Sequence, residues 1–279
     1  MTLSLQAADD SLLPPLGRVG VWFNDPDNWT GPQGLLARIV EHLEYTAIVL
    51  VIAVLIALPL GLLIGHTGRG VVLAVGLANA FRAIPTLGLV ILLVGWLRPL
   101  IEFKGAVPGL LQKGAFPFFV PVMIVLVLLA LPPILTSTYA GVKNVDPAVR
   151  DAAKGMGMTG WQVVRKVEIP NALPLIASGI RSATLQVIAT LTVAAYLPFL
   201  GGLGRFIKDG TGRLLDPRYG YPAMVAAGLT VALLAVAIDG LMNLVQRAVV
   251  SPGVSGRFSK KDRTAVTSSP TSVAQVVQE

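Results

Sequence analysis

The sequence of 279 residues contains no cysteine, only two histidines and few charged residues. Without cysteine the chain can form neither disulfides nor thiolate metal sites, and His42 and His66 alone do not favour a metalloenzyme. It contains no G-x-x-x-x-G-K-[ST] loop, so we do not expect it to bind and hydrolyse nucleotide by itself. Basic residues form no stripe with interleaved aromatic residues, and no nucleic acid partner is expected.

Hydrophobic residues, in contrast, make up 54% of the chain and charged residues 13%, which is typical of a protein that lies in a bilayer. Apolar residues are continuous in several runs rather than alternating with polar ones, which favours helices over a membrane barrel. At about 1.5 Å per residue, runs free of Asp, Glu, Lys, Arg and His are long enough to cross or nearly cross a hydrocarbon core of about 30 Å. These runs are residues 45–65, 83–97, 114–142, 182–204 and 219–238. We therefore predict an all-α membrane protein of about five spans.

The second of these runs is irregular. Residues 70–81 are also apolar, but Arg82 and Pro85 interrupt the sequence before the run that ends near Trp96. Proline removes a helical hydrogen bond and disfavours helix at Ile84, so a break is expected there. Either 71–81 is an interfacial helix followed by a short span, or the region is one long kinked span or two short ones, so six spans remain possible. Arg82 is a functional candidate at membrane depth or a snorkelling anchor at the cytoplasmic interface.

Charge and composition also suggest how the chain is divided and oriented. Residues 1–41 lack a basic region followed by an apolar core, so we expect a non-spanning segment at the membrane surface rather than a cleavable signal peptide. Residues 42–250 form the membrane domain, and residues 251–279 read as a flexible cytoplasmic tail. Basic residues in loop 143–168 and after the last span favour a cytoplasmic position for both. Loop 205–218 is also basic, but it lies one span away from each of these segments and therefore faces the other side of the membrane. The positive-inside rule thus favours a cytoplasmic loop 143–168 without deciding it.

The polar loop between the third and fourth runs begins with a predicted short helix. Asp146 can cap free backbone N–H groups, and Pro147 suits the first helical position. Small or flexible side chains then recur on one face at helical spacing, at Ala148, Ala152 and Met156. Glycines at positions 155 and 157 can end this helix. We expect a compact surface that another protein can approach closely.

A second short helix is predicted to follow. Thr159 can cap it, and Trp161, Val164 and Val167 give it an apolar side before Pro170 interrupts it. The alternative to a protein-contact surface is an amphipathic loop that lies on anionic lipid headgroups. Elsewhere, Gly61 and Gly65 allow close helix packing, either within one chain or between two copies.

Residues 151–170 resemble the EAA loop of permease subunits in binding-protein-dependent ABC importers of the type I fold. The matching residues are Asp151-Ala152-Ala153, then Gly157 after three residues, then Val167-Glu168-Ile169-Pro170 after nine more. Asp stands where Glu is usual, and Val167 where Ile is commoner. Further similar stretches are Arg82-Ala-Ile-Pro85-Thr-Leu, Leu131-Pro-Pro-Ile, Thr138-Tyr-Ala-Gly-Val, Val145-Asp-Pro-Ala, Gly155-Met-Gly-Met-Thr-Gly-Trp-Gln-Val, Ala172-Leu-Pro-Leu-Ile, Gly179-Ile-Arg181 and Gly201-Gly-Leu-Gly-Arg-Phe. Together they resemble the osmoprotectant branch over roughly residues 40–250.

The resemblance implies a type I importer transmembrane domain with cytoplasmic coupling helices in a bacterial-type cytoplasmic membrane. The implied function is ATP-driven import of quaternary ammonium solutes such as glycine betaine, choline, carnitine and proline betaine. ATP and Mg would bind a partner dimer of cytosolic ABC ATPase subunits and not this chain. The other implied partners are an extracytoplasmic substrate-binding protein and a second permease subunit, either another copy or a paralogue. With aromatic residues at only 6%, no cation–π cage is evident, so specificity is expected in the binding protein.

The resemblance also assigns roles to residues, none of them catalytic and none metal-binding. Coupling to the ATPase is assigned to Asp151, Ala152, Ala153, Gly157, Ile169 and Pro170. Asp151 would pair with a basic residue of the ATPase or with Arg150 or Lys154 nearby, or would simply be a carboxylate near a helix N-terminus. The translocation path or gate is assigned to Arg82, Pro85, Thr86 and Tyr196, and binding-protein contact to Gly201, Gly202 and Gly204. Tyr196-Leu-Pro-Phe199 departs from the small residues usual in the osmoprotectant branch, so the outer gate is expected to differ in shape.

Three alternatives stay open at this point. Methionine permeases share a related Arg-x-Ile-Pro segment and a glycine-rich loop after the fourth span, so the solute could be methionine or another amino-acid-like compound. An ion-coupled secondary carrier would need an intramembrane acid, for which Asp239 is the candidate. An intramembrane enzyme would need a nucleophile and a base within the spans, and the charge-free runs contain no His, Cys or Glu.

Overall fold

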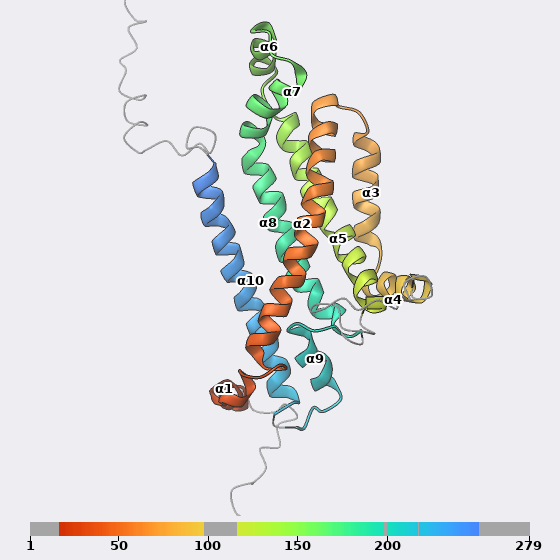
Figure 1. The fold of residues 1–279 in the computed structure, drawn as a ribbon, viewed down its shortest axis with the longest axis vertical. Helices are drawn as coiled ribbons and strands as arrows, with labels where there is room; N and C mark the ends of the chain where they lie inside the picture. The colour runs from red at the N-terminus through yellow and green to blue at the C-terminus, as the bar shows by residue number, and fades with distance from the viewer. Residues whose placement is uncertain (1–16, 98–115, 198–199, 217, 251–279) are drawn as a thin grey trace, which may run out of the picture.

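The computed structural model describes residues 17–97, 116–197, 200–216 and 218–250, and their regular structure is helical throughout. Within these described residues, four helices are long and apolar enough to cross a membrane and run along the molecule (Figure 1). They are α2 (Leu35–Thr67), α5 (Phe116–Lys143), α8 (Ile169–Ala194) and α10 (Tyr221–Val249). The shorter elements are α1 (Gly17–Asn24), η1 (Pro26–Asn28), α3 (Val71–Ala83), α4 (Thr86–Leu97), α6 (Pro147–Gly155), α7 (Gly160–Val163), η2 (Val164–Glu168) and α9 (Gly204–Thr211).

The irregular second run forms two short helices. Ile84 adopts an extended conformation between α3 and α4, as predicted for the residue before Pro85. α3 runs upright beside α5, whereas α4 lies across the lower end of α5, with Val90 buried in the core (Figure 1). The structure therefore divides this region into two short helices, and which of them crosses the membrane stays a prediction, as does the choice between five and six spans.

The core lies where α2, α5 and α8 meet, because each presents a stripe of small and branched apolar residues to the others. Glycines bring these helices close together. A Cβ atom built on Gly61 would lie 2.7 Å from the Thr138 Cβ atom, and one on Gly179 would lie 2.6 Å from that of Ser137. Gly65 similarly faces Val142. The small residues at positions 61 and 65 thus pack against α5 of the same chain.

The fourth and fifth spans extend beyond the charge-free runs that predicted them. Arg181 limits the run 182–204 at its start, yet α8 begins earlier, at Ile169. Asp239 limits the run 219–238 at its end, yet α10 continues to Val249. The two charged side chains pair with each other, with Arg181 Nη2 donating to Asp239 Oδ2 at 2.5 Å and Nε to Oδ1. Since each charge neutralises the other, both can lie inside apolar helices. α8 also ends at Ala194, ten residues before the predicted limit.

The two ends of the bundle carry different elements. α6 and α7 lie at one end, toward which α10 also finishes, whereas α1 and α9 lie at the opposite end (Figure 1). α1 packs through Val19 and Trp22 against Leu35, Leu203 and the start of α10. Residues 35–41 form the first turns of α2, so this helix begins within the segment 1–41, whose non-spanning role stays a prediction. Residues 1–16 and the tail 251–279 lie outside the described part of the chain.

Candidate functional site

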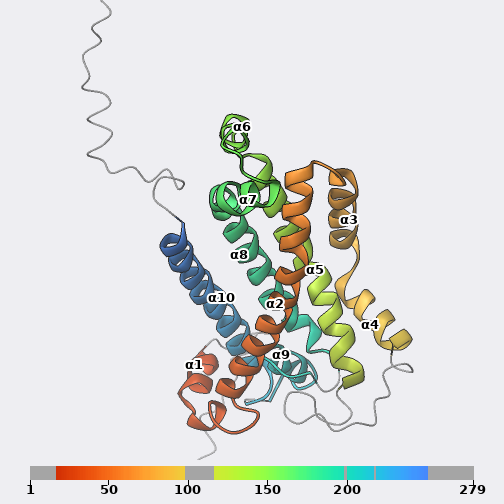
Figure 2. The same cartoon turned by 45° about the horizontal axis from the view of Figure 1, so that its top comes forward.

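Residues 143–170, hereafter the 143–170 segment, form a small projection in which α6 rises beyond the end of α2 and α7 lies beside that end (Figure 2). Its two predicted caps are present. Asp146 Oδ1 accepts a hydrogen bond of 2.9 Å from the Ala148 N–H, with Pro147 at the first helical position. Thr159 forms a reciprocal capping box with Gln162 at the start of α7. Because both caps are local, the sequence determines where each short helix begins.

The bend between α6 and α7 depends on Gly157. Its φ is +83°, a left-handed conformation that side chains rarely adopt, and α6 ends two residues earlier at Gly155. A Cβ atom on either glycine would meet open space, so Gly157 is required for its backbone conformation and not for close packing.

The outer surface of the projection carries exposed apolar and small side chains between charged ones. Met156 is 72% exposed and Trp161 68% exposed, and Ala148, Val149 and Ala152 are exposed as well. Such large apolar side chains in water are unusual on a surface without a partner. The face predicted from helical spacing is therefore available for contact with another molecule.

The three residues of the Asp151-Ala152-Ala153 triplet differ in their exposure. Asp151 and Ala152 face outward, while Ala153 is buried. Within the described residues Asp151 forms no ion pair, and Arg150, one of the partners considered for it, instead contacts Glu168. Ile169 and Pro170 lie at the start of α8, where Ile169 is half-buried and Pro170 exposed.

Pro170 does not interrupt the second helix, contrary to the prediction. α7 continues through the π-helix η2 into α8 without a break, making one helix from Gly160 to Ala194. In the wider π turn the Ile169 N–H donates to the Val164 carbonyl, five residues earlier. The Asn171 side chain then donates to the Val167 carbonyl at 2.7 Å. The helix thus continues across Pro170 although this residue has no N–H to donate.

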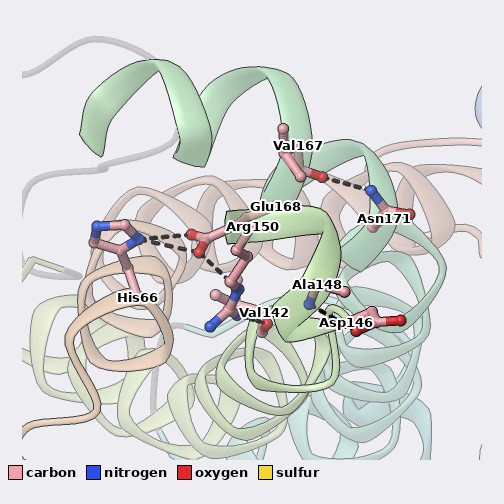
Figure 3. A network of polar contacts seen from close by, with 8 residues as sticks. All are labelled: His66, Val142, Asp146, Ala148, Arg150, Val167, Glu168 and Asn171. Atoms are coloured by element: carbon pink, nitrogen blue, oxygen red, sulfur yellow. Dashed lines mark hydrogen bonds and ion pairs between the residues drawn. The ribbon is translucent and has the colours of Figure 1, made fainter. Parts of the chain in front are cut away.

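Sequence reasoning missed a buried charged cluster under the projection. Glu168, at the end of η2, is 0% exposed. Its carboxylate lies 2.9 and 3.0 Å from His66 Nδ1, at the end of α2, and 3.1 Å from Arg150 Nε, on α6 (Figure 3). The Arg150 contact is an ion pair without the alignment of a hydrogen bond. One indication was present in the sequence, since Glu168 stands between two apolar residues on a helix.

The residues assigned to a path or gate are spread over two places. Pro85 and Thr86 lie at the break between α3 and α4, and Tyr196 follows the last turn of α8, where it is 45% exposed. No hydrogen bond joins these residues in the part of the chain that the structure describes. The side chain of Arg82 and residues 198–199 lie outside that part. A gate at these positions stays a prediction.

The three glycines after α8 are buried, and each lies in close contact with a neighbouring element. A Cβ atom on Gly201 would lie 2.0 Å from a Glu41 carboxylate oxygen, and one on Gly204 would lie 2.2 Å from a backbone carbonyl of α8. Gly202 has a φ of +80° and donates its N–H to Glu41 at 2.8 Å. These contacts hold the loop against α2, and its contact with a binding protein stays a prediction.

His42 completes this attachment and was also not foreseen. Its ring is fully buried, with Nε2 3.0 Å from the Ile188 carbonyl and Nδ1 3.3 Å from the Leu203 N–H. The carbonyl can only accept and the N–H can only donate, so Nε2 carries the proton and Nδ1 accepts. At the same end, N–H groups of Tyr219 and Arg218 donate to Asp216 and hold the pKa of its carboxyl below the ordinary value. Polar contacts of His42 and Asp216 therefore stabilise the end of the bundle that carries α1 and α9.

Comparison with known proteins agrees with this architecture. The model of a family described as "Binding-protein-dependent transport system inner membrane component" matches residues 37–251. The chain is 32% identical over 222 residues to the glycine betaine/carnitine/choline transport system permease protein of Bacillus subtilis (strain 168), covering 80% of this chain and 91% of that protein. It is 32% identical to the osmoprotectant import permease protein of Salmonella typhimurium (strain LT2), covering 79% and 94% of the two chains.

A solved structure has the same fold. A chain in the inward-facing methionine ABC transporter MetNI superposes with a TM-score of 0.62 at 22% identity, covering 78% of this chain and 97% of that one. The fold is that of a type I ABC importer transmembrane domain, and the chain is a multi-pass membrane protein. It belongs to the family of inner membrane components of binding-protein-dependent transport systems.

Proposed function

We propose that this chain is the membrane-spanning subunit of an ATP-driven importer of quaternary ammonium osmoprotectants, the class that includes glycine betaine, choline, carnitine and proline betaine. The main support is the projecting 143–170 segment. It is capped at both short helices, bent at a left-handed glycine and exposed on its apolar outer face, and it is continuous with α5 and α8. A force applied to it reaches two spans of the core directly.

The partner that applies this force would be a dimer of cytosolic ABC ATPase subunits, which would bind ATP and Mg. Asp151, Ala152 and Met156 present the contact surface, while Ala153 packs inward and Gly157 sets the angle between α6 and α7. Ile169 and Pro170 pass the movement into α8. Closure of the ATPase dimer would then switch the spans between two discrete arrangements.

The solute class is supported by the relatives, whose names include glycine betaine, carnitine and choline. An extracytoplasmic binding protein would select the solute and deliver it to the α1 and α9 end. A second permease subunit, either another copy or a paralogue, would complete the pore. Exposed apolar side chains along α10, such as Leu233 and Val236, are available to lipid or to that subunit.

Methionine or another amino-acid-like solute is the second candidate, since the fold is shared with the methionine transporter. An ion-coupled carrier has less support, because its candidate acid, Asp239, is already paired with Arg181. A carboxylate held by a guanidinium does not readily exchange an ion.

The test is uptake of radiolabelled glycine betaine, choline, carnitine and methionine by cells that express this chain with its ATPase and binding protein. The matched control replaces the phosphate-binding lysine of the ATPase, which leaves the permease unchanged. We expect uptake of a quaternary amine that needs both this chain and the active ATPase.

Uptake of methionine alone would keep the permease and replace the solute class. Uptake that persists with the inactive ATPase but collapses when the membrane potential is dissipated would replace the proposal by a secondary carrier.

A further inference from the structure

The buried cluster beneath the projection joins elements that are far apart in the sequence. Glu168 belongs to η2, Arg150 to α6 and His66 to the end of α2, 102 residues before Glu168. Since the carboxylate only accepts hydrogen bonds, His66 Nδ1 must carry the proton that it donates to Glu168. Arg150 also donates through Nη2 to the backbone carbonyl of Val142, near the end of α5 (Figure 3). Three helical elements, η2, α6 and α2, thus meet at this carboxylate, and Arg150 connects them to the end of α5.

The buried Glu168 carboxylate would lose stabilising interactions if it separated from its partners. Glu168 is excluded from water, so its carboxylate depends on His66 and Arg150 for the interactions that water would otherwise provide. Separating α6 from η2 would leave the carboxylate buried with only His66. The three side chains therefore favour states in which α6, η2 and the end of α2 keep one arrangement.

Apolar packing does not hold α2 to the projection by itself. Between the end of α2 and α7 lies an apolar groove of about 550 Å³, lined by Leu58, Pro59, Leu62, Leu63, His66, Gly160, Trp161 and Val164. His66, which lines this groove, connects the end of α2 to η2 through its contact with Glu168.

The π-helix contributes to the geometry of this connection. A π turn holds more residues than an α turn and changes the direction of the side chains that follow it. In η2 it accompanies the inward orientation of Glu168, while the adjacent Arg165 and Lys166 remain exposed. Arg165 and Lys166 therefore remain in water while Glu168 is buried. The backbone of η2, and not the charge of the segment, determines that Glu168 points inward.

We propose that Glu168, with Arg150 and His66, is a positioning cluster that makes α6 move as one body with the ends of α2, α5 and α8. Movement imposed on α6 by the ATPase is then delivered to the spans and not absorbed by bending of the 143–170 segment. This inference rests on the proposed function, which assigns α6 to ATPase contact, and it gives the three residues a role in coupling.

The first test measures solute taken up per ATP hydrolysed by the complete transporter in proteoliposomes. Glu168→Gln removes the charge while preserving the shape of the side chain. We expect hydrolysis to continue while the uptake-to-hydrolysis ratio falls roughly 2- to 30-fold, the range typical of residues that carry coupling. Arg150→Gln should lower the ratio in the same way, and Arg150→Lys should restore part of it because the charge remains.

Matched controls apply the same chemistry to exposed positions. Glu44→Gln lies in the exposed part of α2 near its start, and Arg165→Gln lies on η2 beside the cluster. Both should leave the ratio unchanged. A loss of membrane level in Glu168→Gln with a normal ratio in the protein that remains would assign the cluster to folding alone and overturn the proposal.

The second test follows the geometry directly and needs no solute. Because the chain has no cysteine, Lys154→Cys on α6 and Thr67→Cys at the end of α2 can be spin-labelled without removing native thiols. In the complete transporter, the distance between the labels should be single and equal with and without ATP. In the Glu168→Gln background it should broaden or change with ATP.

A wild-type distance that itself changes with ATP would show that α6 moves relative to α2 and would overturn the inference. Absence of ATP-dependent uptake of any solute by the wild-type transporter would instead count against the proposed function. If uptake is normal and Glu168→Gln alters neither ratio nor distance, only the positioning role fails.

Discussion

Individual residues of this chain are constrained mainly by backbone conformation and by close approach. Gly157 and Gly202 both have positive φ, but Gly157 faces open space whereas Gly202 lies against His42. The same glycine type therefore has two different roles, one in setting a bend on the surface and one in attaching a buried loop. Substitutions can distinguish them.

Replacing Gly157 with Ala or a bulkier residue should impair coupling while the protein still inserts in the membrane. The left-handed conformation costs a non-glycine residue about 1–2 kcal/mol, which favours a different angle between α6 and α7. Uptake relative to membrane level is the measurement. Gly155→Ala is the matched control, because it also faces open space but lacks a positive φ. Normal uptake by Gly157→Val would count heavily against a coupling role.

Replacing Gly202 with Ala should lower stability instead. The new Cβ atom would lie 3.1 Å from His42 Nδ1 at a φ of +80°, so a loss of about 1–3 kcal/mol is expected. Thermal unfolding of the purified protein in detergent would show this as a lower Tm. Gly212→Ala, at a φ of −85° with open space around it, should unfold like the wild type. Equal Tm values for both variants would contradict the tight attachment of the loop.

At the scale of elements, the helices are held by two kinds of contact. Small residues bring α2, α5 and α8 together, whereas α10 meets α8 through Arg181–Asp239 and a hydrogen bond of 3.2 Å from Gln246 to the Pro174 carbonyl. Within apolar helices a polar pair gives orientation that uniform packing lacks. α10 is accordingly expected to depend on this pair for its position.

Asp239→Asn or Arg181→Gln should lower the membrane level and the Tm, because each leaves the opposite charge unneutralised. Exchanging the charges in Arg181→Asp with Asp239→Arg should recover part of both. Quantitative blotting and thermal unfolding provide the measurements. Removing the exposed pair Arg205–Asp209 within α9 should have little effect in comparison. Additive losses in the exchanged variant would show that the two side chains do not act together.

At the scale of the whole molecule, the position of α6 and α9 at opposite ends predicts their sidedness. The distribution of basic residues favours one membrane orientation without deciding it. The structure adds that the end of α10 lies toward α6 and away from α9 (Figure 1). The 143–170 segment and the C-terminal end of α10 therefore share one side, as the positive-inside rule suggests.

Single cysteines can check this in the naturally cysteine-free chain. Lys154→Cys on α6 should react with a membrane-impermeant maleimide only after the cells are opened, whereas Lys208→Cys on α9 should react in intact spheroplasts. The unmodified chain provides the background. Labelling of Lys154→Cys from outside would reverse the orientation and remove the ATPase contact from the proposed mechanism.

The amino-acid sequence by itself determined the all-helical membrane fold, the break before Pro85, the caps at Asp146 and Thr159 and the bend at Gly157. Each follows from hydrophobic length, missing N–H groups, capping side chains or backbone freedom, all of which act within a few residues. The sequence-based reading was wrong about Pro170, because the π turn that accommodates it depends on the packing of the longer helix.

Only the tertiary structure decided which charged residues meet. Arg181 and Asp239 limited the predicted spans because an isolated charge is costly in an apolar helix, but their pairing across 58 positions removes that cost. The connection of Glu168 to Arg150 and His66 was equally invisible to periodicity. A buried polar group requires a partner, and the identity of a distant partner depends on how the helices pack in three dimensions.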